Sequence, residues 1–278
     1  MELLLNEKSL DGQFQDQDDF YQTLPVMSRN LGVLRKCGIS LLKHSSLYDR
    51  RITKDMSVLE LRNRTGKVNP IYRDQVKKWK RELSCLAMEP PFWDTDFPEC
   101  ENSLEEAARR RTDVLSFPHP DYQDRTLTVA YKGKEVSIKS AVTTQYLLEL
   151  LWQGKVMNTF DYLRLRYNEG RLRTDFLDVG MKSIMELEKT EAEELLIALN
   201  RFESKSWPEI QQDMFFCYKS YQPPSKKQNY FLHTEYADKK IDKFRCGKHS
   251  KIRCFGYREE DFFYILMIER DHSVSDTG

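Results

Sequence analysis

The chain has 278 residues, of which 40% are hydrophobic and 12% aromatic, and its 44 basic side chains balance 44 acidic ones. This composition supports a real core and excludes a globally disordered chain, while the zero net charge excludes a strong overall field. The longest apolar run, Phe262–Ile268, is far shorter than the roughly 20 residues of a membrane span. The first residues lack the features of a signal peptide, and the six cysteines lack disulfide-framework spacing. We therefore expect a soluble, cytoplasmic protein.

The first hundred residues alternate between strand and helix patterns. In chain order they predict a strand at 3–5, a helix from about residue 16 to Gly38, a strand at 39–42 and a helix at 71–86. Gly38 is expected to end the first helix as a left-handed cap. The Pro-rich segment 89–94 should break the second helix, so we place the first domain boundary near residue 100.

The remaining residues contain more helices and end in a strand-rich segment. The predicted elements are a helix at 103–111, a strand at 114–117, a hairpin at 125–131 and 134–138, helices at 140–152, 159–167, 190–203 and 207–218, and strands at 252–257 and 262–268. Capping boxes are expected at Ser103 with Glu106 and at Thr190 with Glu193. Phe262–Ile268 is apolar on both faces, which is typical of a central strand.

These elements predict an α+β fold with mixed helices and a C-terminal antiparallel sheet, because no regular strand–helix–strand rhythm occurs. We expect three domains: an N-terminal α/β region at 1–100, a mainly helical region with a hairpin at 101–204, and a basic β-rich region at 205–278.

Charge is strongly segregated along the neutral chain. Residues 1–20 carry a net charge of −5, whereas residues 50–81 (the first basic segment) and 219–258 (the second basic segment) each carry +8. We predict that both segments lie on one side of the molecule and form a groove for nucleic acid. Its expected contacts are Lys77, Lys78, Lys80, Arg81, Lys239, Lys240, Lys243, Arg245, Lys248 and Lys251. The alternative is a solvated surface that pairs with the acidic segments.

The second basic segment also suggests a catalytic hypothesis. If residues 245–257 form one extended strand, then Arg245, Lys251 and Arg253 share a face, and His249 falls on that face too. A histidine beside cations suits RNA cleavage without a metal, because it can move a proton while the cations stabilise the phosphate charge. Asp271 and His272, directly after the last strand, are further candidates. The alternatives are a solvated edge strand and a surface pair.

Other chemistry is less well supported by the sequence. Cys246, His249 and Cys254, with Cys217 or His233, resemble a zinc ligand set, but free thiols fit the spacing better. A metal-dependent nuclease could use Glu135 with Asp113 or Asp124, but Lys134 precedes Glu135 in the wrong order. We therefore predict no metal and no cofactor. No GxxxxGK[ST] motif occurs, so the chain is not a P-loop ATPase.

Two stretches carry a family resemblance. The opening MELLLNEKSLDGQF (1–14) and the stretch EPPFWD (89–94) are similar to a bacterial protein family of anti-phage defence islands, whose genes lie beside ATPase genes. Members share a basic, His-containing strand pair near the C-terminus, here Cys246 to His272, and the Menshen system is one possible home. The resemblance covers the two ends of the chain and implies no catalytic set.

The leading hypothesis is therefore a component of an antiviral, anti-phage defence complex. It would form a hetero-oligomer with a partner ATPase and contact nucleic acid through its basic patches. The alternative is a nuclease-type toxin that cleaves RNA or DNA with the C-terminal basic sheet, which leaves open whether the chain is an enzyme.

Overall fold

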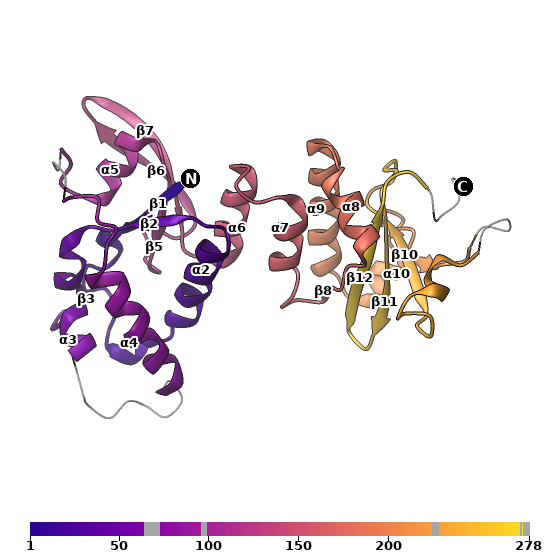
Figure 1. Ribbon diagram of the computed structural model, residues 1–278, viewed down its shortest axis with the longest axis horizontal. Helices are drawn as coiled ribbons and strands as arrows, with labels where there is room; N and C mark the ends of the chain where they lie inside the picture. Colours follow the sequence, from indigo (N-terminus) through magenta and orange to yellow (C-terminus); the bar gives the residue numbers. More distant parts are fainter. Residues whose placement is uncertain (64–72, 96–98, 224–227, 273, 275–278) are drawn as a thin grey trace. The chain divides into compact units, whose positions relative to one another are not determined.

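Helices and strands combine in the α+β class that the sequence predicts. The computed structural model describes residues 1–63, 73–95, 99–223, 228–272 and 274. They form two compact units, Met1–Val156 and Met157–Gly278 (Figure 1). The predicted boundaries near residues 100 and 204 fall inside these units, and the division into three domains stays a prediction.

The first unit is built on a mixed five-stranded sheet with the order β2-β1-β5-β7-β6. Its strands are β1 (Glu2–Asn6), β2 (Ser40–Leu42), β5 (Val114–Ser116), β6 (Arg125–Tyr131) and β7 (Lys134–Ala141). The first four in that order are parallel, and β6 pairs with β7 as the antiparallel edge. Leu3, Leu4 and Leu5 are buried in β1 because both faces of this strand are covered.

Helices and short elements complete the first unit. They are η1 (Glu7–Ser9), α1 (Gln17–Tyr21), α2 (Leu24–Lys36), η2 (Ser45–Asp49), β3 (Arg51–Thr53), β4 (Met56–Ser57), α3 (Val58–Asn63), α4 (Arg73–Met88), α5 (Ser103–Arg110) and α6 (Thr144–Gln153). The single helix predicted from residue 16 to Gly38 is wrong, since the chain breaks at Gln22 and Thr23. Pro25 lies in the first turn of α2, where a missing N–H is tolerated. Gly38 has a φ of 63°, as its predicted role requires.

Both predicted capping boxes are wrong by one or two residues. The α5 cap is Asn102, whose Oδ1 accepts hydrogen bonds from the backbone of Leu104 and Glu105, each at 3.1 Å. The Ser103 hydroxyl instead accepts from the indole of Trp93 at 3.0 Å. In α9 (Lys189–Glu203) the box joins Glu188 and Glu191 rather than Thr190 and Glu193.

The second unit contains the second five-stranded sheet, with the order β8-β12-β11-β10-β9. Its elements are α7 (Thr159–Arg166), β8 (Leu172–Thr174), α8 (Asp178–Met185), α9, α10 (Trp207–Gln212), β9 (Lys219–Ser220), η4 (Tyr230–His233), β10 (Ile241–Arg245), β11 (Arg253–Glu259) and β12 (Phe262–Glu269). The pairing is antiparallel except between β12 and β8. The helix predicted at 207–218 ends early, because the chain turns into β9.

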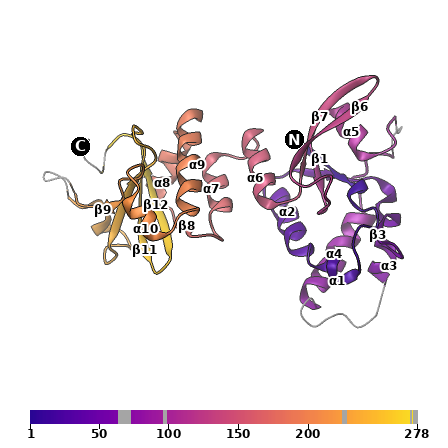
Figure 2. The ribbon, with the colours of Figure 1, turned by 180° about the vertical axis from the view of Figure 1, so that it is seen from behind.

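β12 is a central strand, as its apolar pattern predicts. It pairs with β8 on one side and β11 on the other, and Leu266 is fully buried. On one face Phe263 joins an aromatic cluster with Phe202 and Phe244. On the other face Leu266 packs in a cluster that includes Phe231. α8 lies against this strand (Figure 2).

Within the described ranges, no helix combines the length and the apolar character needed to cross a membrane.

Candidate functional site

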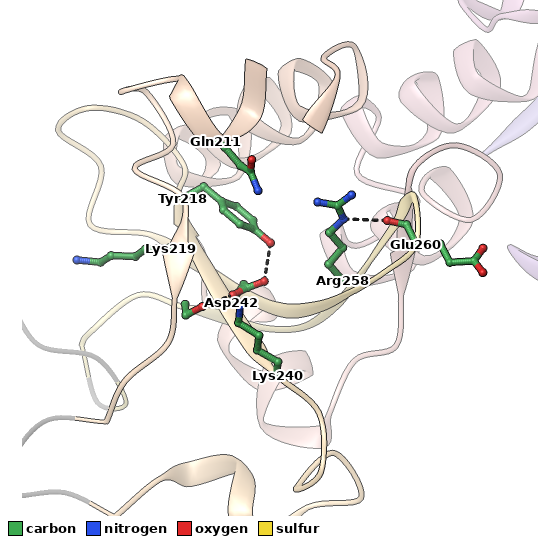
Figure 3. A pocket seen from close by; sticks show the side chains of 8 residues that line it. Gln211, Tyr218, Lys219, Lys240, Asp242, Arg258 and Glu260 are labelled. Atoms are coloured by element: carbon green, nitrogen blue, oxygen red, sulfur yellow. Dashed lines mark hydrogen bonds between the residues drawn. The ribbon is translucent and has the colours of Figure 1, made fainter. Parts of the chain in front are cut away.

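A pocket of about 600 Å³ opens on the second unit (Figure 3). It lies between α10, the start of β10 and the turn that joins β11 to β12. Its lining residues are Gln211, Tyr218, Lys219, Ser220, Lys240, Asp242, Arg258 and Glu260. Three of the eight side chains are cationic and two, Asp242 and Glu260, are acidic, so the lining has a small excess of positive charge that favours an anionic group.

A buried carboxylate is held on one side of this pocket. The alternation of β10 directs Asp242 and Phe244 to the same face of the sheet. Asp242 is only 7% exposed, and its two oxygens accept hydrogen bonds from the hydroxyls of Tyr218 at 2.7 Å and Ser220 at 2.9 Å. These bonds compensate for the burial of the carboxylate. They also tie β9 and the residue before it to β10.

The Tyr218 hydroxyl is a firmly protonated donor. Burial, and next the hydrogen bond to Asp242, hold the pKa of Tyr218 well above its ordinary value. Tyr218 therefore acts here as a positioning group and not as an acid or base near neutral pH.

The Arg258 guanidinium lies over the ring of Trp207, with its carbon 4.0 Å from the ring centroid. Its Nε donates to the carbonyl of Glu260 at 2.8 Å, and the indole of Trp207 donates to the carbonyl of Asp261 at 3.3 Å. The stack and these two bonds fix the plane of the guanidinium. An arginine held in this way can offer both terminal nitrogens to a phosphate at a reduced entropic cost.

Gln211, Lys219 and Lys240 line other parts of the same pocket. Figure 3 shows Gln211 reaching down from α10 toward the space that Tyr218 and Arg258 face. Lys219 and Lys240 are exposed and project outward at the rim. This arrangement suits an anion seated against Arg258, with further negative charges placed near the rim lysines.

The predicted catalytic residues lie in a different part of the second unit. Residues 245–257 do not form one strand, because β10 ends at Arg245 and β11 begins at Arg253 after a loop. The prediction that strand alternation places His249, Lys251 and Arg253 on one face is therefore wrong. His249 and Lys251 are exposed on the loop, whereas Arg253 is buried.

The Arg253 side chain makes hydrogen bonds to the backbone of the loop that precedes it. Its Nη1 donates to the carbonyls of Ser250 at 2.6 Å and Ile252 at 3.1 Å, which holds the loop closed. Burial, and next the charge of Arg245, lower the pKa of the Arg253 guanidinium.

Sheet register nevertheless brings most of the catalytic candidates to one end of the sheet. Arg245 pairs with Arg253, which pairs with Glu269, in a row across three strands. The loop 246–252 therefore lies at the same end as Asp271 and His272, which follow β12. The pocket lies at the opposite end, beside the β11–β12 turn.

The predicted nucleic-acid contacts have varied environments. In the second unit, Lys240 lines the pocket, Lys239 pairs with Glu259 at 3.1 Å, and Lys248 is exposed. Lys243 lies 5.8 Å from the centroid of the Tyr221 ring, and Arg245 belongs to the row described above.

The first basic segment presents Lys77, Lys78 and Arg81 as exposed side chains on α4. The side chain of Lys80 is outside the described part of the chain. Because the two basic segments belong to separate units, their union in one groove stays a prediction.

Two cysteines of the zinc set considered above are buried, Cys246 on the loop after β10 and Cys254 in β11. Cys246 and Cys254 are buried free thiols, and burial raises the pKa of both. Among the residues that the structure describes, no group of three or more His, Cys, Asp or Glu side chains could hold a metal ion. Two of the three carboxylates considered for a metal nuclease accept backbone hydrogen bonds: Asp113 from the N–H of Lys139 at 2.7 Å, and Asp124 from the N–H of Val142 at 2.7 Å.

The sequence did not identify most of the pocket. Gln211, Tyr218, Ser220, Asp242 and Arg258 were not among the predicted site residues. One sequence feature could have indicated the site: Asp242 is an acidic residue in a strand whose other residues are apolar or basic. Arg258 lies in the basic segment, but only the fold places it on Trp207.

Comparison with known protein families, with curated proteins and with solved structures finds no match.

Proposed function

We propose that this chain is a nucleic-acid-contacting component of a bacterial anti-phage defence complex and acts with a partner ATPase. The observation that carries the nucleic-acid part is the pocket lined by Arg258, which stacks on Trp207, and by the rim lysines Lys219 and Lys240. The defence part rests on the resemblance of residues 1–14 and 89–94, and the need for a partner ATPase fits the absence of a P-loop motif.

The pocket suits one phosphate of a longer polyanion. A volume of about 600 Å³ lies within the range of nucleotide-sized ligands. Arg258 would bind the seated phosphate, while Lys219 and Lys240 would neutralise its neighbours along the strand. Asp242 offers no favourable contact to a phosphate: its two oxygens accept hydrogen bonds from Tyr218 and Ser220, and its negative charge opposes those of the three cations in the lining.

Binding of labelled RNA and DNA, single- and double-stranded, tests the site directly. Arg258→Gln should weaken binding about tenfold or more, because a charge-assisted contact contributes roughly 1.5–3 kcal/mol. The matched control is Arg164→Gln, since Arg164 is another exposed arginine of the same unit that lies over an aromatic ring, Phe160. Equal affinities for wild type and Arg258→Gln would reject the pocket as the contact.

Partnership with an ATPase needs a separate experiment. Co-expression of the chain with the ATPase encoded beside its gene, followed by size-exclusion chromatography, should give a shared peak. A chain that elutes alone with and without ATP or nucleic acid would reject this part, whatever the pocket binds.

A nuclease effector is the second candidate, because the fold gathers His249, Lys251, Asp271 and His272 at one end of the sheet. Under that hypothesis, His249→Ala should abolish cleavage by the activated complex and leave nucleic-acid affinity unchanged. Arg258→Gln should instead lower affinity. Intact substrate after incubation with the activated wild-type complex would reject the nuclease.

A further inference from the structure

The hairpin of β6 and β7 extends past the other strands of the first sheet (Figure 1). β7 pairs with β5 only at Ser140 and Ala141, so most of the hairpin is a two-stranded ribbon. Such a ribbon is marginally stable in water unless a face is covered. Here α5 covers one face, where Ala107 and Ala108 belong to the cluster that Leu127 and Val129 pack against.

The backbone of β6 has an outer edge that can accept another strand. Lys132 and Gly133 form the turn with φ of 48° and 74°, as in a type I′ hairpin. In such a hairpin the flanking pair, Tyr131 and Lys134, exchanges both backbone hydrogen bonds. Hydrogen-bonded pairs recur at every second residue, so the backbone groups of Leu127 and Val129 also form their hydrogen bonds with β7.

The backbone groups of Thr126, Thr128 and Ala130 consequently point outward. The side chains of these three residues are exposed. Within the described ranges, β6 is the last strand of its sheet, and no strand pairs with its outer side.

The one charged residue of β6 is Arg125 at its start, and the residues that follow it lack the features that usually protect an edge. Charged side chains, prolines and bulges prevent edge-to-edge pairing, and residues 126–130 contain no charge and no proline. The outer edge of β7 differs, because Lys134 and Glu135 are charged and the backbone N–H of Lys139 donates to Asp113 at 2.7 Å. Of the two edges of the hairpin, β6 is the open one.

We infer that β6 pairs with β6 of a second copy of this chain, antiparallel and centred on Thr128. In this register each Thr128 faces the other, Thr126 faces Ala130, Leu127 faces Val129 and Arg125 faces Tyr131. Threonine pairs, aliphatic pairs and a cation beside an aromatic ring are favourable across strands, and no like charges meet. The strand is thus complementary to itself, which identifies a second copy as the partner.

The pairing would add about six backbone hydrogen bonds and extend the sheet across both copies. Its area is small for a stable dimer, so association should depend on protein concentration. This inference is independent of the pocket and of the proposed function.

Sedimentation velocity of the full chain over a dilution series tests the pairing. Wild type should shift from monomer to dimer as concentration rises. Thr128→Lys and Thr128→Glu should each stay monomeric, because the two-fold axis places each new charge opposite itself. An equal mixture of the two variants should form a dimer again, since lysine then faces glutamate.

The matched control is Ser137→Lys. Ser137 is exposed and directly opposite Thr128 on β7, one strand inside the edge, so its lysine does not meet itself across the axis. Circular dichroism should show all variants folded. The inference is overturned if wild type stays monomeric throughout, if the single Thr128 variants dimerise like wild type, or if their mixture fails to associate.

Discussion

The hydroxyl of Tyr218 donates a 2.7 Å hydrogen bond to Oδ2 of Asp242. Tyr218 precedes β9 and Asp242 lies in β10, so this bond joins the last two strands of the sheet through their side chains. Together with Ser220 it allows a carboxylate to remain buried beside the pocket. The pocket therefore depends on an interaction that contributes to folding as well as to shape.

Loss of this bond should destabilise the protein. Tyr218→Phe removes the donor and leaves a buried carboxylate oxygen without its partner, at a cost of about 1.5–3 kcal/mol. Ser220→Ala should cost less, because Ser220 is exposed and water can replace its hydroxyl. Urea unfolding of both variants measures the difference. A Tyr218→Phe loss no larger than that of Ser220→Ala would contradict this account.

Alkaline pH should reveal the same environment. Burial and the bond to Asp242 raise the pKa of Tyr218 above its ordinary value of 10.0. A raised folded-state pKa contributes stability that is complete below the unfolded value and is lost as pH rises beyond it. Stability should therefore fall above about pH 10, and less steeply in Tyr218→Phe. Parallel curves of unfolding free energy for both proteins would exclude the predicted linkage.

The central position of β12 predicts a large cost for truncating its core residue. Leu266 is fully buried, so Leu266→Ala should lower the unfolding free energy by about 2–5 kcal/mol. Ile197 on α9 is 63% exposed. Ile197→Ala should therefore change the unfolding free energy by no more than about 0.5 kcal/mol. Chemical denaturation of the two variants makes the comparison. A Leu266→Ala loss below about 1 kcal/mol would contradict a central strand.

Two helical glycines should respond to alanine with opposite signs. A Cβ on Gly180 would lie 2.8 Å from the carbonyl oxygen of Leu266 and 3.1 Å from the Cα of Met267, where α8 meets β12. Gly180→Ala should therefore cost about 1–3 kcal/mol. Gly32 in α2 has nothing within 4 Å of that position, and Gly32→Ala should stabilise by about 0.4–1 kcal/mol. Thermal unfolding of both variants measures the two changes in stability. A Gly180→Ala variant as stable as wild type would contradict the close packing of α8 on β12.

Local patterns in the sequence predicted most strands and helices correctly. The hairpin at 125–138 and the strand at 262–268 follow from alternation, a two-residue turn and an unbroken apolar run. The errors fall where two local signals compete. Asn102 and Ser103 can both cap a helix, and the Ser103 hydroxyl is instead occupied by a hydrogen bond from the indole of Trp93, which lies outside the helix.

The candidate site was less predictable because its parts are brought together by the sheet. Tyr218, Asp242 and Arg258 come from three separate segments, and no spacing rule connects them. The strand predicted at 252–257 is present as β11, but the longer strand at 245–257 that the catalytic hypothesis supposed does not form, because Gly247 and its neighbours make a loop between β10 and β11. The fold class could be read from the sequence, but the pocket required the pairing of β9, β10 and β11.

The salt dependence of nucleic-acid binding tests the central claim most directly. Filter binding of wild type and Arg258→Gln, from low to moderate ionic strength, gives the slope of log affinity against log salt for each. Wild-type binding should weaken steeply with salt, and Arg258→Gln should reduce the slope by about 0.7–0.9, the loss of one phosphate contact. Arg164→Gln should keep the wild-type slope. No salt-sensitive binding at low ionic strength, or equal slopes for wild type and Arg258→Gln, would contradict a phosphate contact in the pocket.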